Sequence, residues 1–124
     1  MIVYLTPVAK PRMTRSDKWK KRPVTDRYWK FKDEWKKQVP SALDLNYKQI
    51  EFVMPMPKSW SKKKRAEMDG KPHTQKPDLD NLLKGIGDAH YQDDSVIHCL
   101  DGIKKTWGVA GFIVITNQDC DLPW

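Results

Sequence analysis

The sequence predicts a single small α+β domain, in which helices pack on one face of a mixed β-sheet of about four strands. The chain has 124 residues, a length that supports one compact hydrophobic core. Its strand-like and helix-like segments follow the order β-α-β-(α)-α-β-β, which is typical of helices packed against one sheet. Residues 1–124 are therefore expected to form one domain.

The first half of the chain is expected to contain two strands, a basic arm and a helix. Residues 2–8 have the pattern of a strand. Residues 9–23 hold two prolines and a dense basic run, which indicates an irregular arm or loop. Residues 25–39 place apolar side chains at helical spacing, and residues 47–54 predict a second strand. The apolar stripe of the helix comprises Val24, Tyr28, Phe31, Trp35 and Val39.

Two helices are expected next. Residues 59–69 form a short basic segment that Ser59 can cap and Gly70 can end. Residues 77–90 predict a further helix with Pro77 in its first turn. The apolar side of this helix comprises Leu79, Leu82, Leu83, Ile86 and His90.

The chain is expected to end in a β-hairpin and a tail. Residues 95–106 and 109–116 predict two strands that pair around Trp107 and Gly108. Residues 119–124 predict a loose or edge-docked tail.

Charge is unevenly distributed along the chain, whose formal net charge is +7. Residues 10–37 contain 12 Lys and Arg against 4 Asp and Glu, and residues 58–76 contain 7 against 2. Residues 77–101 reverse this balance, with Lys84 against six aspartates. Basic segments favour a phosphate backbone, and an acidic centre between them opposes it unless cations neutralise the carboxylates.

Several classes of protein are excluded by the same composition. No apolar run approaches the roughly 20 residues that span a membrane, and the first residues lack the pattern of a signal peptide. Cys99 and Cys120 lack the spacing of a metal site, so we expect neither a zinc site nor a disulfide. The expectation is a cytoplasmic protein with no membrane association and no small-molecule cofactor.

The aspartates of the helix at 77–90 allow two interpretations. Asp80, Lys84 and Asp88 share a face roughly opposite the apolar stripe, and Asp78 lies at the helix start. The ordinary interpretation is that Asp78 and Asp80 stabilise the positive end of the helix, and that Asp80 and Lys84 form a surface ion pair.

Asp93 and Asp94 favour a metal site instead, provided that the chain returns them to the helix. Three or four carboxylates in one pocket would repel each other without a divalent cation, and Mg²⁺ is the natural candidate. A bound Mg²⁺ lowers the pKa of a water that can attack phosphorus. Lys84 could then donate to that water or to a phosphate oxygen.

The stretch from Lys76 to Ile97 resembles the signature of the RusA family of Holliday-junction resolvases. The likeness consists of Asp-x-Asp-Asn, a Lys four residues beyond the second Asp, and a later Asp-Asp pair. These residues are Asp78, Asp80, Asn81, Lys84, Asp93 and Asp94. Lys10-Pro11-Arg12 and the segment from Met54 to Arg65 are also similar to the basic arm and the middle segment of phage-type members.

This resemblance implies a RusA-like fold and a homodimer that cuts four-way junctions by paired symmetric nicks, in DNA recombination and repair. It implies Mg²⁺ as the cofactor, with Mn²⁺ as a substitute, and a bacterial or phage origin. Asp78, Asp80 and Asp94 would bind the metal and act in catalysis, with Asp93 as an auxiliary ligand and Lys84 as the catalytic lysine. Asp88 also falls where the family often has an acid.

The basic side chains are the candidate DNA contacts, although a run of charge is more often a solvated surface. They are Lys10, Arg12, Arg15, Lys18, Lys20, Lys21, Arg22, Lys62, Lys63, Lys64, Arg65 and Lys76. Trp19 and Trp60 lie within the basic runs, where they either stack on bases or pack internally. Trp29 lies off its helix stripe, so it faces either DNA or a second subunit.

Two alternatives to a junction resolvase remain open at the level of sequence. One is a non-catalytic DNA-binding recombination accessory protein, which explains the basic charge but not the acids around Lys84. The other is a nuclease for other branched DNA, such as forks or flaps.

If the basic arm contacts phosphates, affinity for DNA should fall steeply as ionic strength rises, because binding releases counterions. Replacing Lys20, Lys21 and Arg22 with Ala is expected to flatten the plot of log affinity against log salt concentration. An unchanged slope in the triple variant would show that the arm does not contact the phosphates.

Overall fold

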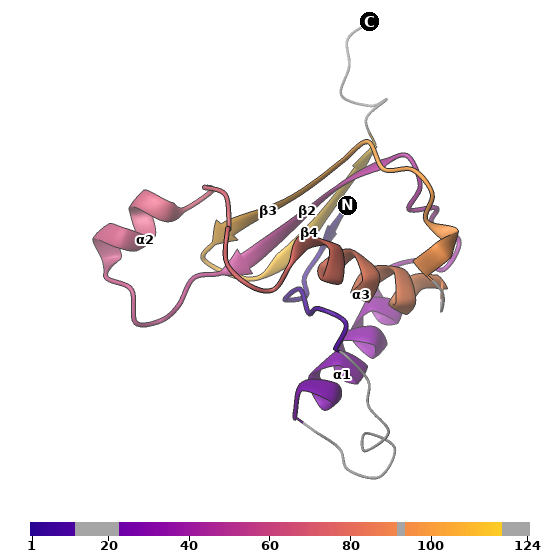
Figure 1. The fold of residues 1–124 in the computed structure, drawn as a ribbon, viewed down its shortest axis with the longest axis horizontal. Coiled ribbons are helices and arrows are strands. Elements are labelled where there is room, and N and C mark those ends of the chain that lie inside the picture. Colours follow the sequence, from indigo (N-terminus) through magenta and orange to yellow (C-terminus); the bar gives the residue numbers. More distant parts are fainter. Residues whose placement is uncertain (12–22, 92–93, 118–124) are drawn as a thin grey trace, which may run out of the picture.

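The fold is that of a computed structural model, which describes residues 1–11, 23–91 and 94–117. Its elements are β1 (Ile2–Val3), α1 (Pro23–Gln38), β2 (Lys48–Pro55), α2 (Lys62–Met68), α3 (Leu79–Tyr91), the 3-10 helix η2 (Asp94–Val96), β3 (Gly102–Gly108) and β4 (Phe112–Asn117). They form a small mixed sheet with helices, so the predicted α+β class is confirmed (Figure 1). No helix in the described part of the chain combines the length and the apolar character needed to cross a membrane.

The sheet has four strands in the order β1-β4-β2-β3. β2 pairs in parallel with β3 and antiparallel with β4, and β1 pairs antiparallel with β4. The predicted hairpin of the last two strands is therefore wrong, because β2 lies between them. A link of three residues between Gly108 and Phe112 can cross the end of β2, since two strand spacings measure roughly 10 Å. The position between two strands also suits β2, whose Ile50, Phe52 and Val53 are buried.

The core lies between the sheet and the two longer helices. Ile50 and Phe52 of β2 alternate with polar neighbours and are buried, as are Ile113 and Ile115 of β4. The helices contribute the predicted stripes: Tyr28, Phe31, Trp35 and Val39 of α1, and Leu82 and Ile86 of α3, are all buried. The helical periodicity therefore identified the core face of α1 and α3 correctly. The side chain of Val24 lies outside the described residues.

The α2 helix stands away from this core (Figure 1). None of its seven residues is buried. It begins after Ser61, whose Oγ accepts a hydrogen bond from the Lys64 N–H at 3.2 Å, so the cap is Ser61 and not the expected Ser59. Gly70 has a φ of 78° and follows the helix, as its sequence position predicted.

The N-terminal segment is strand only at Ile2–Val3, and its continuation crosses α3. The Lys10 N–H donates to the Asn81 carbonyl at 3.2 Å. The crossing is close at Gly85, where an added Cβ would lie 2.6 Å from the Val8 carbonyl oxygen. Residues 2–8 therefore cannot continue as one strand, because the chain leaves the sheet to pass over the helix.

Gly85→Ala is expected to lower the free energy of unfolding by about 1 to 3 kcal/mol, because the new methyl group forces the Val8 backbone away from α3. Urea unfolding measures this change.

Gly102→Ala is the matched control, since a Cβ there meets only the Gln49 Cγ, at 3.6 Å, which is an ordinary contact. Its expected effect is within about 0.5 kcal/mol. Equal effects of the two substitutions would show that the crossing is not tightly packed.

Candidate active site at the start of α3

The predicted catalytic residues gather at the N-terminal end of α3. Asp78 immediately precedes the helix, and its carbonyl accepts the Leu82 N–H at 3.1 Å. The side chains of Asp78, Asp80 and Lys84 are exposed. Lys84 Nζ lies 4.0 Å from Asp80 Oδ2, which confirms the expected surface pair. Water screens this pair, so it contributes at most a few tenths of a kcal/mol to stability and leaves both groups available for a ligand.

A shallow depression adjoins these acids. It has a volume of about 420 Å³ and is lined by Lys76, Pro77, Asp78 and Asn81. Among the described residues, none donates a hydrogen bond to the carboxylate of Asp78 or Asp80. Oxygens that no protein donor occupies can bind a cation, so this pair of carboxylates has the chemistry of a metal site.

Residues 70–73 extend the sheet and lead the chain to Asp78. The Gly70 N–H donates to the Trp107 carbonyl at 2.9 Å, and the Trp107 N–H donates to the Lys71 carbonyl at 3.0 Å. The His73 N–H continues the ladder with the Lys105 carbonyl at 2.9 Å. The start of α3 is therefore placed by main-chain pairing with the far end of β3, which no local sequence pattern specifies.

An aromatic cluster supports the same end of β3. The Trp107 ring lies 4.1 Å from the His73 ring and 4.7 Å from the Trp60 ring, between centroids. Lys64 Nζ lies 4.5 Å from the Trp60 centroid. Burial, together with the charge of Lys105, lowers the pKa of His73, so its imidazole is neutral at pH 7. Trp60 is partly buried against the core, which favours the packing interpretation of this tryptophan.

Asp88 was expected on an exposed face with Asp80 and Lys84, and this expectation is wrong. Its side chain is only 16% exposed. The Tyr28 hydroxyl donates to its Oδ2 at 2.6 Å, and Lys32 Nζ donates to the same oxygen at 3.2 Å. The periodicity of one helix could not show that α1 covers this part of α3.

Asp88 also forms an ion pair with Lys10, near the beginning of the basic arm. Lys10 Nζ lies 3.7 Å from its Oδ1. Burial alone would raise the pKa of the Asp88 carboxyl, but the hydrogen bonds from Tyr28 and Lys32 and the charges of Lys32 and Lys10 lower it below its ordinary value. Asp88 is thus an anchoring group between three donors, whereas Asp78 and Asp80 face solvent.

The later acid Asp94 lies beyond the C-terminal end of α3. The backbone of Asp94 belongs to η2, which follows the C-terminal end of α3, about 20 Å of helix rise from Asp78. Asp93 and the side chain of Asp94 lie outside the described residues. Within the described residues no group of three or more His, Cys, Asp or Glu could hold a metal ion. The structure thus brings together Asp78, Asp80 and Lys84, and the participation of Asp93 and Asp94 stays a prediction.

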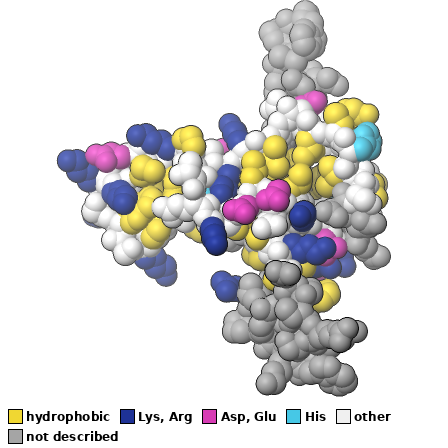
Figure 2. All heavy atoms as spheres, in the orientation of Figure 1, with side chains coloured by type: hydrophobic (Ala, Val, Ile, Leu, Met, Phe, Trp, Pro, Cys, Tyr) yellow, Lys and Arg dark blue, Asp and Glu magenta, His cyan; other side chains and the backbone are white. Residues whose placement is uncertain are grey.

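Basic side chains surround the acids on the face shown in Figure 2, where two acidic side chains lie close together near the start of α3. Lys76 is exposed beside them, and Lys62, Lys63 and Lys64 are exposed on α2. The Arg65 guanidinium is less free, because it donates to the Pro57 carbonyl at 3.1 Å. The other predicted contacts, Arg12, Arg15, Lys18, Lys20, Lys21 and Arg22, lie outside the described residues.

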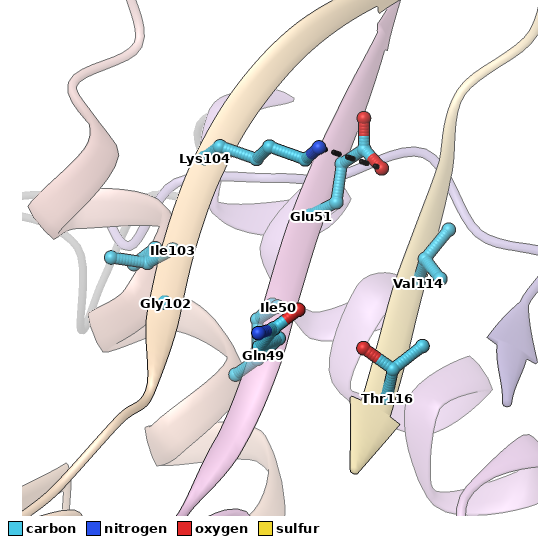
Figure 3. A pocket seen from close by; sticks show the side chains of 8 residues that line it. All are labelled: Gln49, Ile50, Glu51, Gly102, Ile103, Lys104, Val114 and Thr116. Atoms are coloured by element: carbon cyan, nitrogen blue, oxygen red, sulfur yellow. Dashed lines mark ion pairs between the residues drawn. The ribbon is translucent and has the colours of Figure 1, made fainter. Parts of the chain in front are cut away.

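A second depression, of about 460 Å³, lies on the sheet face that α1 and α3 leave uncovered (Figure 3). Glu51 is the only acid in its lining. The carboxylate of Glu51 accepts a hydrogen bond from the Thr106 hydroxyl at 2.7 Å and lies 3.9 Å from Lys104 Nζ. With its one carboxylate already engaged, this surface offers no comparable cation site.

Two residues that hold the chain at the two ends of α3 escaped sequence reasoning. Lys105 Nζ donates to the Gln75 and Pro77 carbonyls at 2.5 and 2.6 Å. The buried Asn46 side chain accepts the His98 N–H at 2.7 Å and donates to the Val96 carbonyl, fixing the chain after η2. Adjacent lysines in a strand were a usable signal for Lys105, because one of the two must face the covered side.

Comparison with known proteins identifies the family of this chain. The family model for endodeoxyribonuclease RusA matches residues 5–116. The chain belongs to the RusA family. RusA-family proteins are endodeoxyribonucleases that resolve Holliday junctions, so DNA is the substrate class of this protein. A search of curated proteins and a search of solved structures each gave no significant match.

Asp88→Asn is expected to lower the free energy of unfolding by about 1 to 3 kcal/mol at pH 7, because Lys32 loses its buried charged partner. A carboxyl with a lowered folded-state pKa stabilises the fold above its ordinary pKa, and this stabilisation is lost as pH falls through the lowered value. The difference between wild type and variant should therefore shrink below about pH 4.

Chemical denaturation between pH 2 and 7 measures this difference. Glu34→Gln is the control, since its exposed pair with Lys37 contributes little. A difference that stays constant over the whole pH range would rule out the charge of Asp88 as its cause.

Proposed function

We propose that this RusA-family protein is a Mg²⁺-dependent endonuclease that resolves four-way DNA junctions by paired symmetric nicks, in the recombination and repair of DNA in the bacterial cytoplasm. The observation that carries the proposal is the pair of exposed carboxylates, Asp78 and Asp80, within a basic surface. A DNA-binding surface gains nothing from two exposed acids, one of them only loosely paired with Lys84, unless a cation neutralises them.

The donor set fits Mg²⁺. This ion is usually held by one or two carboxylates, keeps several waters, and completes its coordination with substrate phosphates. Asp78, just before α3, and Asp80, in its first turn, supply two such carboxylates, and no described residue donates a hydrogen bond to either. The predicted participation of Asp94 and Asp93 is not part of this two-carboxylate site, because the backbone of Asp94 lies beyond the other end of α3. Mn²⁺ would substitute because it accepts the same oxygen ligands.

When bound, the ion supplies an activated water and stabilises charge on the phosphoryl oxygens. Lys84 lies one turn after Asp80 on the same face of α3. Its ammonium group, 4.0 Å from Asp80, can donate to a phosphate oxygen beside the acids or to the attacking water. Because its side chain is half exposed, contact with the substrate requires little additional desolvation.

The basic groups bind and orient the DNA. Lys62, Lys63 and Lys64 project from α2 on one side of the acids, and Lys10 lies across α3 with its charge partly compensated by Asp88. Paired nicks require two active sites at defined positions on a substrate that has two-fold symmetry. A homodimer supplies that arrangement, so we include it in the proposal.

The decisive experiment incubates the protein with an end-labelled four-way junction and with a matched linear duplex, in Mg²⁺ and in EDTA. Wild type is expected to place symmetric nicks in the junction only, and EDTA is expected to abolish them. Asp80→Asn should reduce cutting by at least about 100-fold while junction binding persists or tightens, because repulsion of the phosphate decreases.

Asp101→Asn is the matched control, because Asp101 is an exposed aspartate just before β3, at the opposite end of this strand from Trp107, which pairs with residues 70–71. It should cut as wild type does. Tight junction binding without cutting in any divalent ion would establish a non-catalytic binder instead. Preferential cutting of forks or flaps would establish a nuclease for other branched DNA.

A further inference from the structure

Lys105 and Lys104 are neighbours on β3 with opposite surroundings. In the strand register Lys105 lies beside the buried Phe52, on the side that the helices cover, and Lys104 lies beside Glu51. Lys104 is 68% exposed. Figure 3 shows its side chain on the sheet face that the helices leave uncovered. Lys105 is partly buried, and its ammonium group donates to the carbonyls of Gln75 and Pro77.

The surroundings of Lys105 are unusual for a lysine. Ordering its long side chain costs conformational entropy, and partial burial costs hydration of the charge. Within the described residues Lys105 forms no ion pair, and both of its hydrogen-bond partners are neutral carbonyls. Charge-assisted hydrogen bonds are stronger than neutral ones, and here they act on two main-chain groups. The side chain therefore acts as a clamp on the segment that ends at Asp78.

The clamp acts where the main-chain ladder stops. The ladder with β3 ends at His73, and the first helical hydrogen bond begins at the Asp78 carbonyl. Between these two points, the bonds of Lys105 are those that join the described chain to the sheet. Without them, Thr74 to Pro77 would lack a hydrogen-bonded connection to β3.

The bond to Pro77 bears directly on Asp78. The Pro77 carbonyl belongs to the peptide unit whose nitrogen is that of Asp78, and this unit is planar. Fixing the carbonyl therefore fixes the direction from which the Asp78 Cα departs. On its other side, the Asp78 carbonyl is held by the Leu82 N–H. Asp78 is thus constrained on both sides, whereas Asp80 is fixed by the helix itself.

We propose that Lys105 is a positioning residue of the active site, which holds Asp78 in register with Asp80 so that the two carboxylates can share one cation. The inference rests on the proposed metal-dependent cleavage. Lys105 itself contacts neither metal nor DNA in this role. It acts through the backbone, so its loss should weaken cation binding more than it weakens DNA binding.

The test compares Lys105→Met with Lys104→Met, which removes the same charge one residue away on the opposite face. The first measurement is hydrogen exchange of the amides of residues 74–78 in the metal-free protein. The second is Mn²⁺ affinity by calorimetry. The third is the Mg²⁺ concentration for half-maximal junction cleavage, and junction affinity in EDTA is the fourth.

Lys105→Met should accelerate exchange over residues 74–78, and it should weaken Mn²⁺ binding and raise the half-maximal Mg²⁺ concentration by about tenfold or more. Its junction affinity in EDTA should match that of Lys104→Met, since both variants lose one positive charge. Lys105→Arg retains the charge and the donors and should recover part of the loss. Should Lys105→Met fail to fold, Lys105→Gln, which keeps one amide donor group, takes its place.

Equal exchange and equal metal dependence in the Lys105 and Lys104 variants would overturn the inference. If wild type binds Mn²⁺ but cuts no branched DNA, the proposed function fails, and exchange and Mn²⁺ affinity still decide the role of Lys105. Failure of wild type to bind Mn²⁺ would overturn the shared cation site and the positioning role together.

Discussion

The parallel pairing of β2 with β3 is the constraint on which the rest of the structure depends. Parallel neighbours cannot be joined by a tight turn, so the chain between them must travel back along the sheet. That return contains α2 and α3, and it places α3 with α1 over one face of the sheet. The same pairing brings the ends of both strands, Pro55 and Gly108, to the same end of the sheet. Near this end, residues 70–73 pair with β3 and lead the chain to Asp78.

One aspartate of α3 stabilises the fold and another is available to bind a cation, and their spacing in the sequence does not show which is which. Asp88 lies where α1 packs on α3, and there its charge is compensated by Lys32 and Lys10. Asp80, two turns earlier, is exposed and only loosely paired with Lys84. A carboxylate surrounded by donors stabilises the fold, and one without them is available to a cation. Burial and partners, not the position in a motif, therefore distinguish the anchoring acid from the candidate ligands.

The residues that support the site belong to β3, which is far from the start of α3 in the sequence. Lys105 holds the segment before Asp78, and its neighbour Lys104 turns to the other face with Glu51. The Trp107 ring contacts the rings of His73 and Trp60 near the C-terminal end of β3. One strand thus supplies the main-chain ladder, the aromatic contact and the clamp for the start of α3. The placement of Asp78 therefore depends on this strand, whereas Asp80 is placed by the helix that contains it.

The sequence by itself determined the composition of the core faces, the α+β class and the acidic motif, because these depend on periodicity and local spacing. Tyr28, Phe31, Trp35 and Ile86 were assigned to the core from helical spacing alone, and each is buried. Only the tertiary structure decided that β2 separates β3 from β4, that α1 partly covers Asp88, and that Lys105 holds the chain before Asp78. These features arise from contacts between residues far apart in the chain, and local patterns carry no information about which distant partner will cover a given face.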